Sequence, residues 1–281
     1  MKILSLFDWM SCGRIALERA WINVDQYYSS EIKWFAIDVT QHNYPDTIQL
    51  WDITKIDWTK LPQIDLIIGW SPCQDFSRAN TKRDGLKWQK SMLFYEFIRL
   101  LKECKPKYFL LENVIMDDIW YNTISEELDI LPIRICGSLV SWALRDRLYR
   151  TNIWPQTIDL FGHKHSTIPK PKDKNIKIND ILEYWYSNKD KHTCLNRNCW
   201  RDASQRYMLK RHNSTGMTTI IYTNQTMAID KWVRYCTQTE LERLHNIPEW
   251  YTSIVNKTKA WDLIWDWWTV DVIAHIFSYI K

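Results

Sequence analysis

A cysteine and a glutamate in the first half of the chain could act together on a polarised ring. Cys73 follows the apolar run Ile64–Ile68 and lies in the segment Ser71-Pro72-Cys73-Gln74. A lone cysteine is ordinarily a small buried apolar residue, but a cysteine with a stabilised thiolate is a nucleophile. Glu112 ends the next central apolar run, and a carboxyl group across from a thiol is what acid- or base-assisted addition to a ring requires. We therefore predict that Cys73 and Glu112 share a site.

Two further groups of residues have more than one interpretation. In Arg145-Asp146-Arg147 both guanidinium groups would lie on one face of an extended segment. They could hold a phosphate or a carboxylate, or be solvated surface. The other group is His192, Cys194, Cys199 and His212. Its spacing does not match a structural zinc site, so we predict surface residues and no metal.

The elements that must position these residues alternate between strand and helix. Strands are predicted over Lys2–Phe7, Tyr27–Glu31, Ile48–Ile53, Ile64–Ile68 and Tyr108–Leu111, and helices over Gly13–Ala20, Ile32–His42 and Ser91–Glu103. This alternation predicts an α/β fold with a Rossmann-like, mostly parallel sheet flanked by helices. Ligands of such sheets bind beyond the carboxyl ends of the strands. Five polar residues are predicted at that edge: Asp8, Glu31, Asp52, Cys73 and Glu112.

The character of the chain changes near Pro155, which suggests three segments. Residues 1–155 are expected to form the sheet domain. Residues 156–231 are richer in Lys, Arg, His and Asn, include the basic stretch Lys189–His212, and are expected to form a small second domain. Residues 232–281 are orderly again and end in an apolar helix predicted over Val270–Ile280. The net charge of +4 allows a polyanionic partner without requiring one.

Composition excludes several classes of protein. The chain is 46% apolar and 25% charged, which is typical of a globular protein and not of a disordered chain. The longest apolar runs fall far short of the ~20 residues that span a bilayer, and the N-terminus reaches Asp8 too soon for a signal peptide. Seven scattered cysteines do not suggest a disulfide framework. We therefore expect a cytoplasmic protein.

Taken in order, these residues resemble the cytosine-C5 DNA methyltransferases. The resemblance is carried by six ordered blocks: Phe7-Asp8 with Gly13; Ser71-Pro72-Cys73-Gln74; Glu112-Asn113-Val114; Val140-Ser141 with Arg145 and Arg147; Cys236–Glu240 with Pro248–Thr252; and Trp268–His275. It implies a class I methyltransferase fold, a target-recognition region at residues 156–231, and residues 232–281 returning to the catalytic domain. The short variable stretch is similar to that of small prokaryotic and viral members.

The resemblance also implies a mechanism. A cytosine is flipped out of double-stranded DNA, Cys73 adds to ring carbon 6, and Glu112 contacts ring nitrogen 3 and the exocyclic amine. Carbon 5 then takes a methyl group from S-adenosylmethionine, and loss of the carbon-5 proton and of Cys73 ends the cycle. Pro72 and Asn113 would hold the loop, and Arg145 and Arg147 would position the base and the loop.

The cofactor S-adenosylmethionine would contact a set of residues at the predicted sheet edge and near the C-terminus. These are Phe7, Asp8, Met10, Ser11, Cys12, Gly13, Glu31, Ile32, Asp52, Ile53, Pro72, Asp266 and Trp268. By the resemblance, Glu31 would accept hydrogen bonds from the ribose hydroxyls, Ile32 would pack on the adenine, and Asp52 would receive the adenine amine.

Glycine and tryptophan usage is unusual, with 6 Gly and 18 Trp. At the ordinary glycine frequency a chain this long would carry about 20. Trp9, Trp21, Trp51, Trp70, Trp265 and Trp267 fall where the family ordinarily has glycine, and Trp88, Trp142 and Trp250 are similar. We hypothesise that these residues are glycine in the living protein, through a code that reads UGA as glycine. UGG codons would refute the idea.

Two alternative functions stay open. One is a catalytically inactive homologue that binds DNA, and the other is an RNA cytosine methyltransferase, whose chemistry generally uses a different cysteine arrangement. A companion restriction endonuclease would fit the resemblance. The sequence does not indicate the target site or the oligomeric state.

Overall fold

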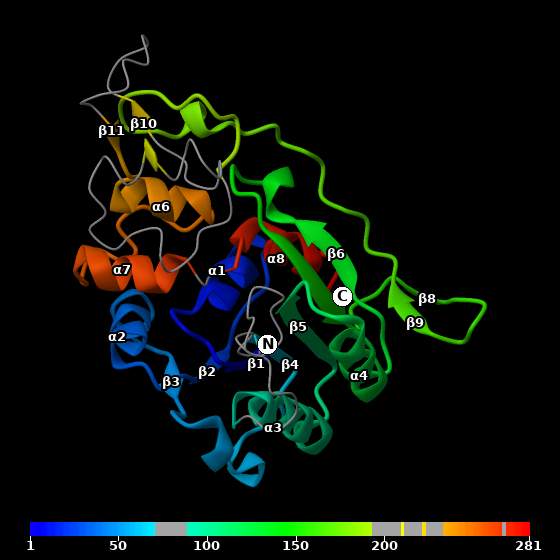
Figure 1. Cartoon of the computed structure of the whole chain (residues 1–281). Coiled ribbons are helices and arrows are strands. Elements are labelled where there is room, and N and C mark those ends of the chain that lie inside the picture. The colour runs from blue at the N-terminus through cyan, green and yellow to red at the C-terminus, as the bar shows by residue number, and fades with distance from the viewer. Residues whose placement is uncertain (71–88, 193–208, 211–220, 223–232, 266–267) are drawn as a thin grey trace. The chain divides into compact units, whose positions relative to one another are not determined.

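The computed structural model of the protein describes residues 1–70, 89–192, 209–210, 221–222, 233–265 and 268–281 (Figure 1). The chain divides into two compact units. The first comprises Met1–Ile135, Asp146–Lys170 and Ile273–Lys281, and the second comprises Cys136–Arg145 and Pro171–Val272.

A seven-stranded sheet organises the chain. Its strands are β1 (Lys2–Leu6), β2 (Gln26–Ser30), β3 (Ile48–Gln49), β4 (Leu66–Trp70), β5 (Tyr108–Val114), β6 (Ile133–Cys136) and β7 (Asp146–Thr151). Their order is β3-β2-β1-β4-β5-β7-β6. The first five strands in this order pair in parallel and β7 runs antiparallel to β5. The predicted Rossmann-like, mostly parallel sheet is confirmed.

Four helices of the first unit follow the parallel strands: α1 (Cys12–Arg19), α2 (Trp34–Asn43), α3 (Gln89–Cys104) and α4 (Asp118–Leu128). One apolar cluster joins α3 and α4 to the sheet, with Phe94 and Phe97 of α3 and Ile124 of α4 buried together with Leu6 and Leu111 of the strands. The strands read as continuous apolar runs because the sheet interior is covered. The same unit contains the hairpin of β8 (Gln156–Ile158) and β9 (Lys164–Ser166).

The described part of the second unit contains α6 (Gln238–Leu244), α7 (Lys257–Ile264), and the short antiparallel pair β10 (Ile221–Tyr222) and β11 (Val233–Arg234). Thr237 caps α6, since its hydroxyl accepts from the Glu240 N–H while the Glu240 carboxylate accepts from the Thr237 N–H. Helix α8 (Val270–Phe277) is the last helix along the described residues.

The strand predicted over Ile48–Ile53 is shorter than expected. It ends at Gln49, and Ile53 begins a 3₁₀ turn (Ile53–Lys55) instead. The Asp52 carboxylate causes this change, because it accepts a hydrogen bond from the Thr54 N–H and caps the turn. The turn places Asp52 just beyond the strand.

None of the helices in the described part of the chain is long and apolar enough to cross a membrane.

Candidate active site

The residues that follow the parallel strands β1 and β2 meet at the carboxyl edge of the sheet. Glu31 lies directly after β2, and its buried carboxylate accepts hydrogen bonds from three backbone N–H groups: those of Trp9 (3.0 Å), Ile32 (2.9 Å) and Lys33 (2.8 Å). Burial raises the pKa of the Glu31 carboxyl, and these hydrogen bonds oppose the rise. Glu31 therefore ties the turn after β1 to the turn after β2.

Ile32 and Asp52 lie at the same edge with their side chains more open to solvent. Ile32 is 71% exposed, which leaves an apolar surface beside Glu31. The hydroxyl and N–H of Thr54 hydrogen-bond the Asp52 carboxylate and lower its pKa. Ile53 is buried, so it can support this edge but offers little surface of its own.

Asp8 is turned into the protein. Its buried carboxylate accepts hydrogen bonds from the hydroxyls of Ser5, Ser11 (2.5 Å) and Tyr27 (2.7 Å). Burial raises the pKa of the Asp8 carboxyl, and the hydroxyl donors oppose the rise. This network stabilises the turn after β1, while Phe7 in the same turn is partly exposed.

The rest of this turn and the start of α1 are closely packed. Met10, Ser11 and Cys12 are fully buried, so none of the three presents surface to a ligand. Gly13 is buried as well, and a Cβ built there would lie 2.2 Å from the Ile68 Cδ1 atom of β4. A larger residue would force the Ile68 side chain to move, so glycine suits this close approach of helix and strand.

Glu112 and Arg147 form a buried ion pair at the next part of the edge. The Arg147 Nε atom lies 2.8 Å from Glu112 Oε1, and the Glu112 side chain is fully buried. The pair forms because β5 and β7 are antiparallel neighbours, with Val114 opposite Arg147. The charge of each group therefore has a partner inside the protein.

Sequence reasoning missed Arg150, which lies on the other face of β7 and is fully buried. Its guanidinium donates to Asn113 Oδ1 (3.4 Å), the Ser125 hydroxyl (3.0 Å) and the Tyr121 carbonyl (2.9 Å). Burial lowers the pKa of Arg150 to about 10. The only signal in the sequence was the position of Arg150 directly after Leu148 and Tyr149.

Two other predicted residues lie in the second unit. Arg145 is buried, and its Nη1 atom donates to the Trp265 carbonyl (3.3 Å). Trp268 is buried too. Arg145 and Arg147 thus belong to different units, although only one residue separates them in the chain.

Three predicted site residues, Pro72, Cys73 and Asp266, lie outside the described residues. The same holds for three of the four residues weighed as zinc ligands: Cys194, Cys199 and His212. The fourth, His192, is buried with its ring 5.4 Å from that of Trp142, so the prediction of a surface residue is wrong at this position.

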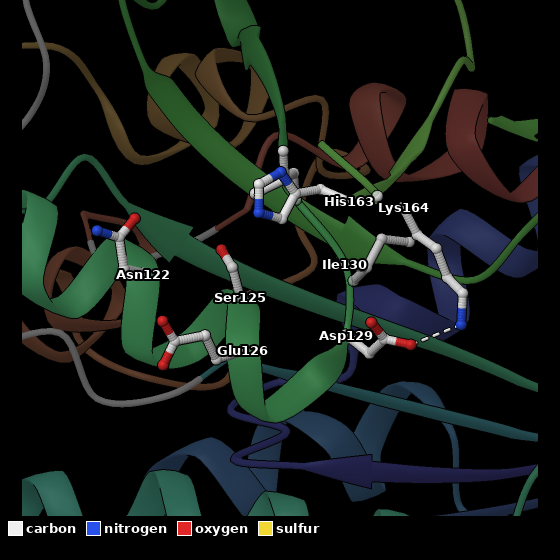
Figure 2. A pocket seen from close by; sticks show the side chains of 9 residues that line it. Asn122, Ser125, Glu126, Asp129, Ile130, His163 and Lys164 are labelled. Carbon is white, nitrogen blue, oxygen red and sulfur yellow. Dashed lines mark hydrogen bonds and ion pairs between the residues drawn. The ribbon is translucent and has the colours of Figure 1, made fainter. Parts of the chain in front are cut away.

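A pocket of about 560 Å³ lies elsewhere in the first unit, between α4 and the β8–β9 hairpin. Figure 2 shows Glu126 and Ser125 on α4, with His163 and Lys164 opposite and Lys164 paired with Asp129 (2.5 Å). None of the described site residues lines it, so we do not assign the candidate active site to this pocket.

Residues 1–116, which contain the edge from β1 through β5, match the family model described as C-5 cytosine-specific DNA methylase. The chain is similar to members of this family. It is 34% identical over 198 residues to the type II methyltransferase M.NgoBV of Neisseria gonorrhoeae, covering 63% of this chain and 46% of that protein. It is 28% identical over 290 residues to M1.ScrFI of Lactococcus lactis subsp. cremoris, covering 92% and 72%.

The chain therefore spans about half the length of M.NgoBV and of M.NlaIV of Neisseria lactamica. Shorter similarity extends to phages, with 35% identity over 116 residues to the orphan methyltransferase M.SPRI of Bacillus phage SPR, covering 41% of this chain and 26% of that protein.

Solved structures have the same fold. The S. pombe Dnmt2 methyltransferase matches with a TM-score of 0.66 and 16% identity, covering 99% of this chain and 97% of that chain. A prophage-encoded DNA modification methyltransferase of E. coli, described as putative, matches with a TM-score of 0.62 and 18% identity, covering 99% and 98%.

Proposed function

We propose that this chain is a DNA cytosine-C5 methyltransferase that acts on a flipped-out cytosine through a covalent Cys73 adduct. The observation that carries the proposal is the buried Glu112–Arg147 pair. Glu112 lies opposite Trp70 in the β4–β5 register, and Cys73 follows Trp70 by three residues in the chain. Strand pairing therefore sets the Glu112 carboxyl group beside the end of β4, the strand that precedes Cys73 in the chain.

In this proposal the Cys73 thiolate adds to carbon 6 of the ring, and Glu112 hydrogen-bonds ring nitrogen 3 and the exocyclic amine. Arg147 holds the Glu112 carboxylate in place. Arg145 positions the base and the loop, and Asn113, supported by Arg150, holds the loop together with Pro72. S-adenosylmethionine, when bound, would supply the methyl group.

The edge residues fit an adenosyl cofactor in part. Glu31 presents a buried carboxylate and Ile32 an exposed apolar side chain beside it, which suit a ribose and an adenine. Phe7, Asp52 and Ile53 would complete this end, and Asp266 and Trp268 the methionine end. Trp9 does not fit, because its indole occupies the same edge.

The DNA partner would be bound by residues 156–231, whose basic side chains suit phosphate contacts. The bacterial and phage sources of the relatives favour a cytoplasmic setting, and the type II relatives favour a companion restriction endonuclease. A catalytically inactive DNA-binding homologue is the second candidate, and the position of Trp9 favours it for the chain as written.

Covalent trapping on a duplex containing 5-fluorocytosine tests the enzyme proposal. The chain, and a version with Trp9, Trp21, Trp51, Trp70, Trp265 and Trp267 changed to glycine, are each incubated with the duplex and S-adenosylmethionine. We expect a denaturation-resistant adduct with the glycine version. Cys73→Ser should abolish it, and Cys104→Ser, at the end of α3, should not. No adduct and no methyl transfer from the glycine version would refute the proposal.

A further inference from the structure

Five tryptophans among the described residues have a left-handed backbone. Their φ angles are 57° at Trp9, 59° at Trp21, 61° at Trp51, 76° at Trp185 and 67° at Trp250. A bulky residue in this region is a clear outlier, because its Cβ crowds the backbone. Glycine has no Cβ and adopts these angles freely. The backbone at all five positions is therefore of the kind that glycine ordinarily occupies.

Side-chain burial does not explain these tryptophans either. Trp21 is 95% exposed, and Trp51, Trp185 and Trp250 are 57%, 44% and 69% exposed. An indole in water gains little of the burial free energy that could offset an unfavourable backbone. Neither the fold nor the packing thus accounts for tryptophan at positions 21, 51 and 250. The Trp185 ring does contact Tyr184 and the Arg234 guanidinium, so at position 185 the backbone angle alone favours glycine.

Trp9 differs because its side chain is buried. Its ring packs edge-to-face on Trp70 at the end of β4, with ring centroids 5.9 Å apart. The Lys33 Nζ atom, beyond the end of β2, lies 3.4 Å from the centroid of the Trp9 ring. Because β1 lies between β2 and β4, the indole covers the carboxyl edge across three adjacent strands. This is where parallel sheets bind their ligands.

We propose that glycine is the native residue at positions 9, 21, 51, 185 and 250, and that the indole of Trp9 alone obstructs the cofactor position. The five positions share one backbone signature, and Trp185 joins them although its sequence context did not single it out. Trp265 has an ordinary helical backbone and Trp70 lies within a paired strand, so the backbone does not extend the assignment to them. The part that concerns the cofactor depends on the proposed function.

The direct test of the glycine assignment is the composition of the natural protein. Tandem mass spectrometry of peptides from the source organism should find glycine at positions 9, 21, 51, 185 and 250. Tryptophan at these positions would overturn the assignment.

Single substitutions in the chain as written test whether tryptophan strains the left-handed backbone. Trp21→Gly should raise the midpoint of thermal unfolding, because it removes strain and no packing. Trp34→Gly is the matched control: Trp34 is also exposed, at 58%, but it lies in α2, where glycine lowers stability. A lower midpoint for Trp21→Gly would contradict the assignment.

Cofactor binding separates the two parts of the proposal. Trp9→Ala removes the ring and Trp9→Gly removes the ring and the strain, so both should bind S-adenosylmethionine at least about tenfold more tightly than the parent. Trp21→Gly should bind like the parent. If the parent binds and neither Trp9 variant binds more tightly, the obstruction by Trp9 is refuted. If Trp21→Gly is stabilised and no variant binds the cofactor, the proposed function fails and the glycine assignment stands.

Discussion

In the Glu112–Arg147 pair, the arginine makes it possible for the glutamate carboxylate to be buried. Glu112 is fully buried, and a buried carboxylate is tolerated only with a partner. Arg147 supplies that partner from the antiparallel strand β7. In the proposed reaction the same contact would hold the carboxyl group against the base.

Removal of one partner should be costly. Arg147→Met leaves the Glu112 charge buried without its partner. We therefore expect the free energy of unfolding, measured in urea, to fall by about 3 kcal/mol. The double variant Glu112→Gln/Arg147→Met should recover part of this loss. Arg134→Met is the control, because the Arg134–Asp146 pair is largely exposed and should contribute less than about 1 kcal/mol. If Arg147→Met and Arg134→Met lower the free energy of unfolding equally, the buried pair contributes no more to stability than the exposed pair.

Thiol reactivity gives a second residue-scale prediction. Burial raises the pKa of Cys104 to about 11 and raises that of Cys236 further, so both thiols stay protonated at pH 8. We expect iodoacetamide to modify Cys73 of the folded chain at least about tenfold faster than these two. Mass spectrometry of digests taken over time measures the rates, with the urea-unfolded chain as reference. Slower modification of Cys73 than of Cys104 would argue against a nucleophilic Cys73.

At the scale of elements, two neighbouring turns depend on one carboxylate. The Glu31 carboxylate accepts hydrogen bonds from backbone N–H groups in the turns that follow β1 and β2. Asp8 supports the first turn from inside, and Asp52 caps the turn that follows β3. The sheet edge is thus built by side chains that satisfy turn N–H groups, because turns lack the regular partners of helices and strands.

Glu31 should make stability depend on pH in a defined direction. Burial raises its pKa above the ordinary value of 4.5, so the folded state takes up the proton more readily than the unfolded state. Its contribution to stability is therefore lost as pH rises from 4.5 through the folded pKa, and is regained on acidification. The free energy of unfolding of the parent, relative to Glu31→Gln, should increase from pH 7 towards pH 4.5. A difference that stays constant or shrinks would contradict this assignment.

At the scale of the whole molecule, the basic second segment is not uniformly available to DNA. The Lys191 ammonium donates to the carbonyls of Ile176 (2.6 Å), Ser138 (2.9 Å) and Ser141 (3.0 Å), all within the second unit. It therefore holds backbone segments together. Lys210, from the same basic stretch, is exposed.

The two lysines should separate stability from DNA binding. Lys191→Met should lower stability by about 2 kcal/mol and leave the salt dependence of duplex binding unchanged. Lys210→Ala should leave stability unchanged and reduce the slope of log affinity against log salt by about 0.9 if Lys210 contacts a phosphate. Thermal melts measure the stability of each variant, and fluorescence anisotropy at several salt concentrations measures the salt dependence of duplex binding. A reduced slope for Lys191→Met would contradict its structural role.

The sequence by itself determined the class of fold and the resemblance to a family. Alternating strand and helix patterns are local, so the parallel sheet could be predicted before any contact was known. The order of short motifs from Phe7-Asp8 to Trp268–His275 carried the family resemblance in the same way. The roles of Cys73, Pro72 and Asp266 stay predictions, because these residues lie outside the described ones.

Only the tertiary structure decided what the individual side chains contact. Asp8 is bonded to Tyr27, Asn113 to Arg150, and Lys191 to Ser138, and each pair joins segments that strand or loop pairing brings together. The residue type alone does not predict such a partner, because the same carboxylate or lysine side chain can lie in water or in the protein interior. The backbone angles of Trp9 and Trp21 are likewise set by the closure of their turns. They support, independently of composition, the glycine assignment proposed above.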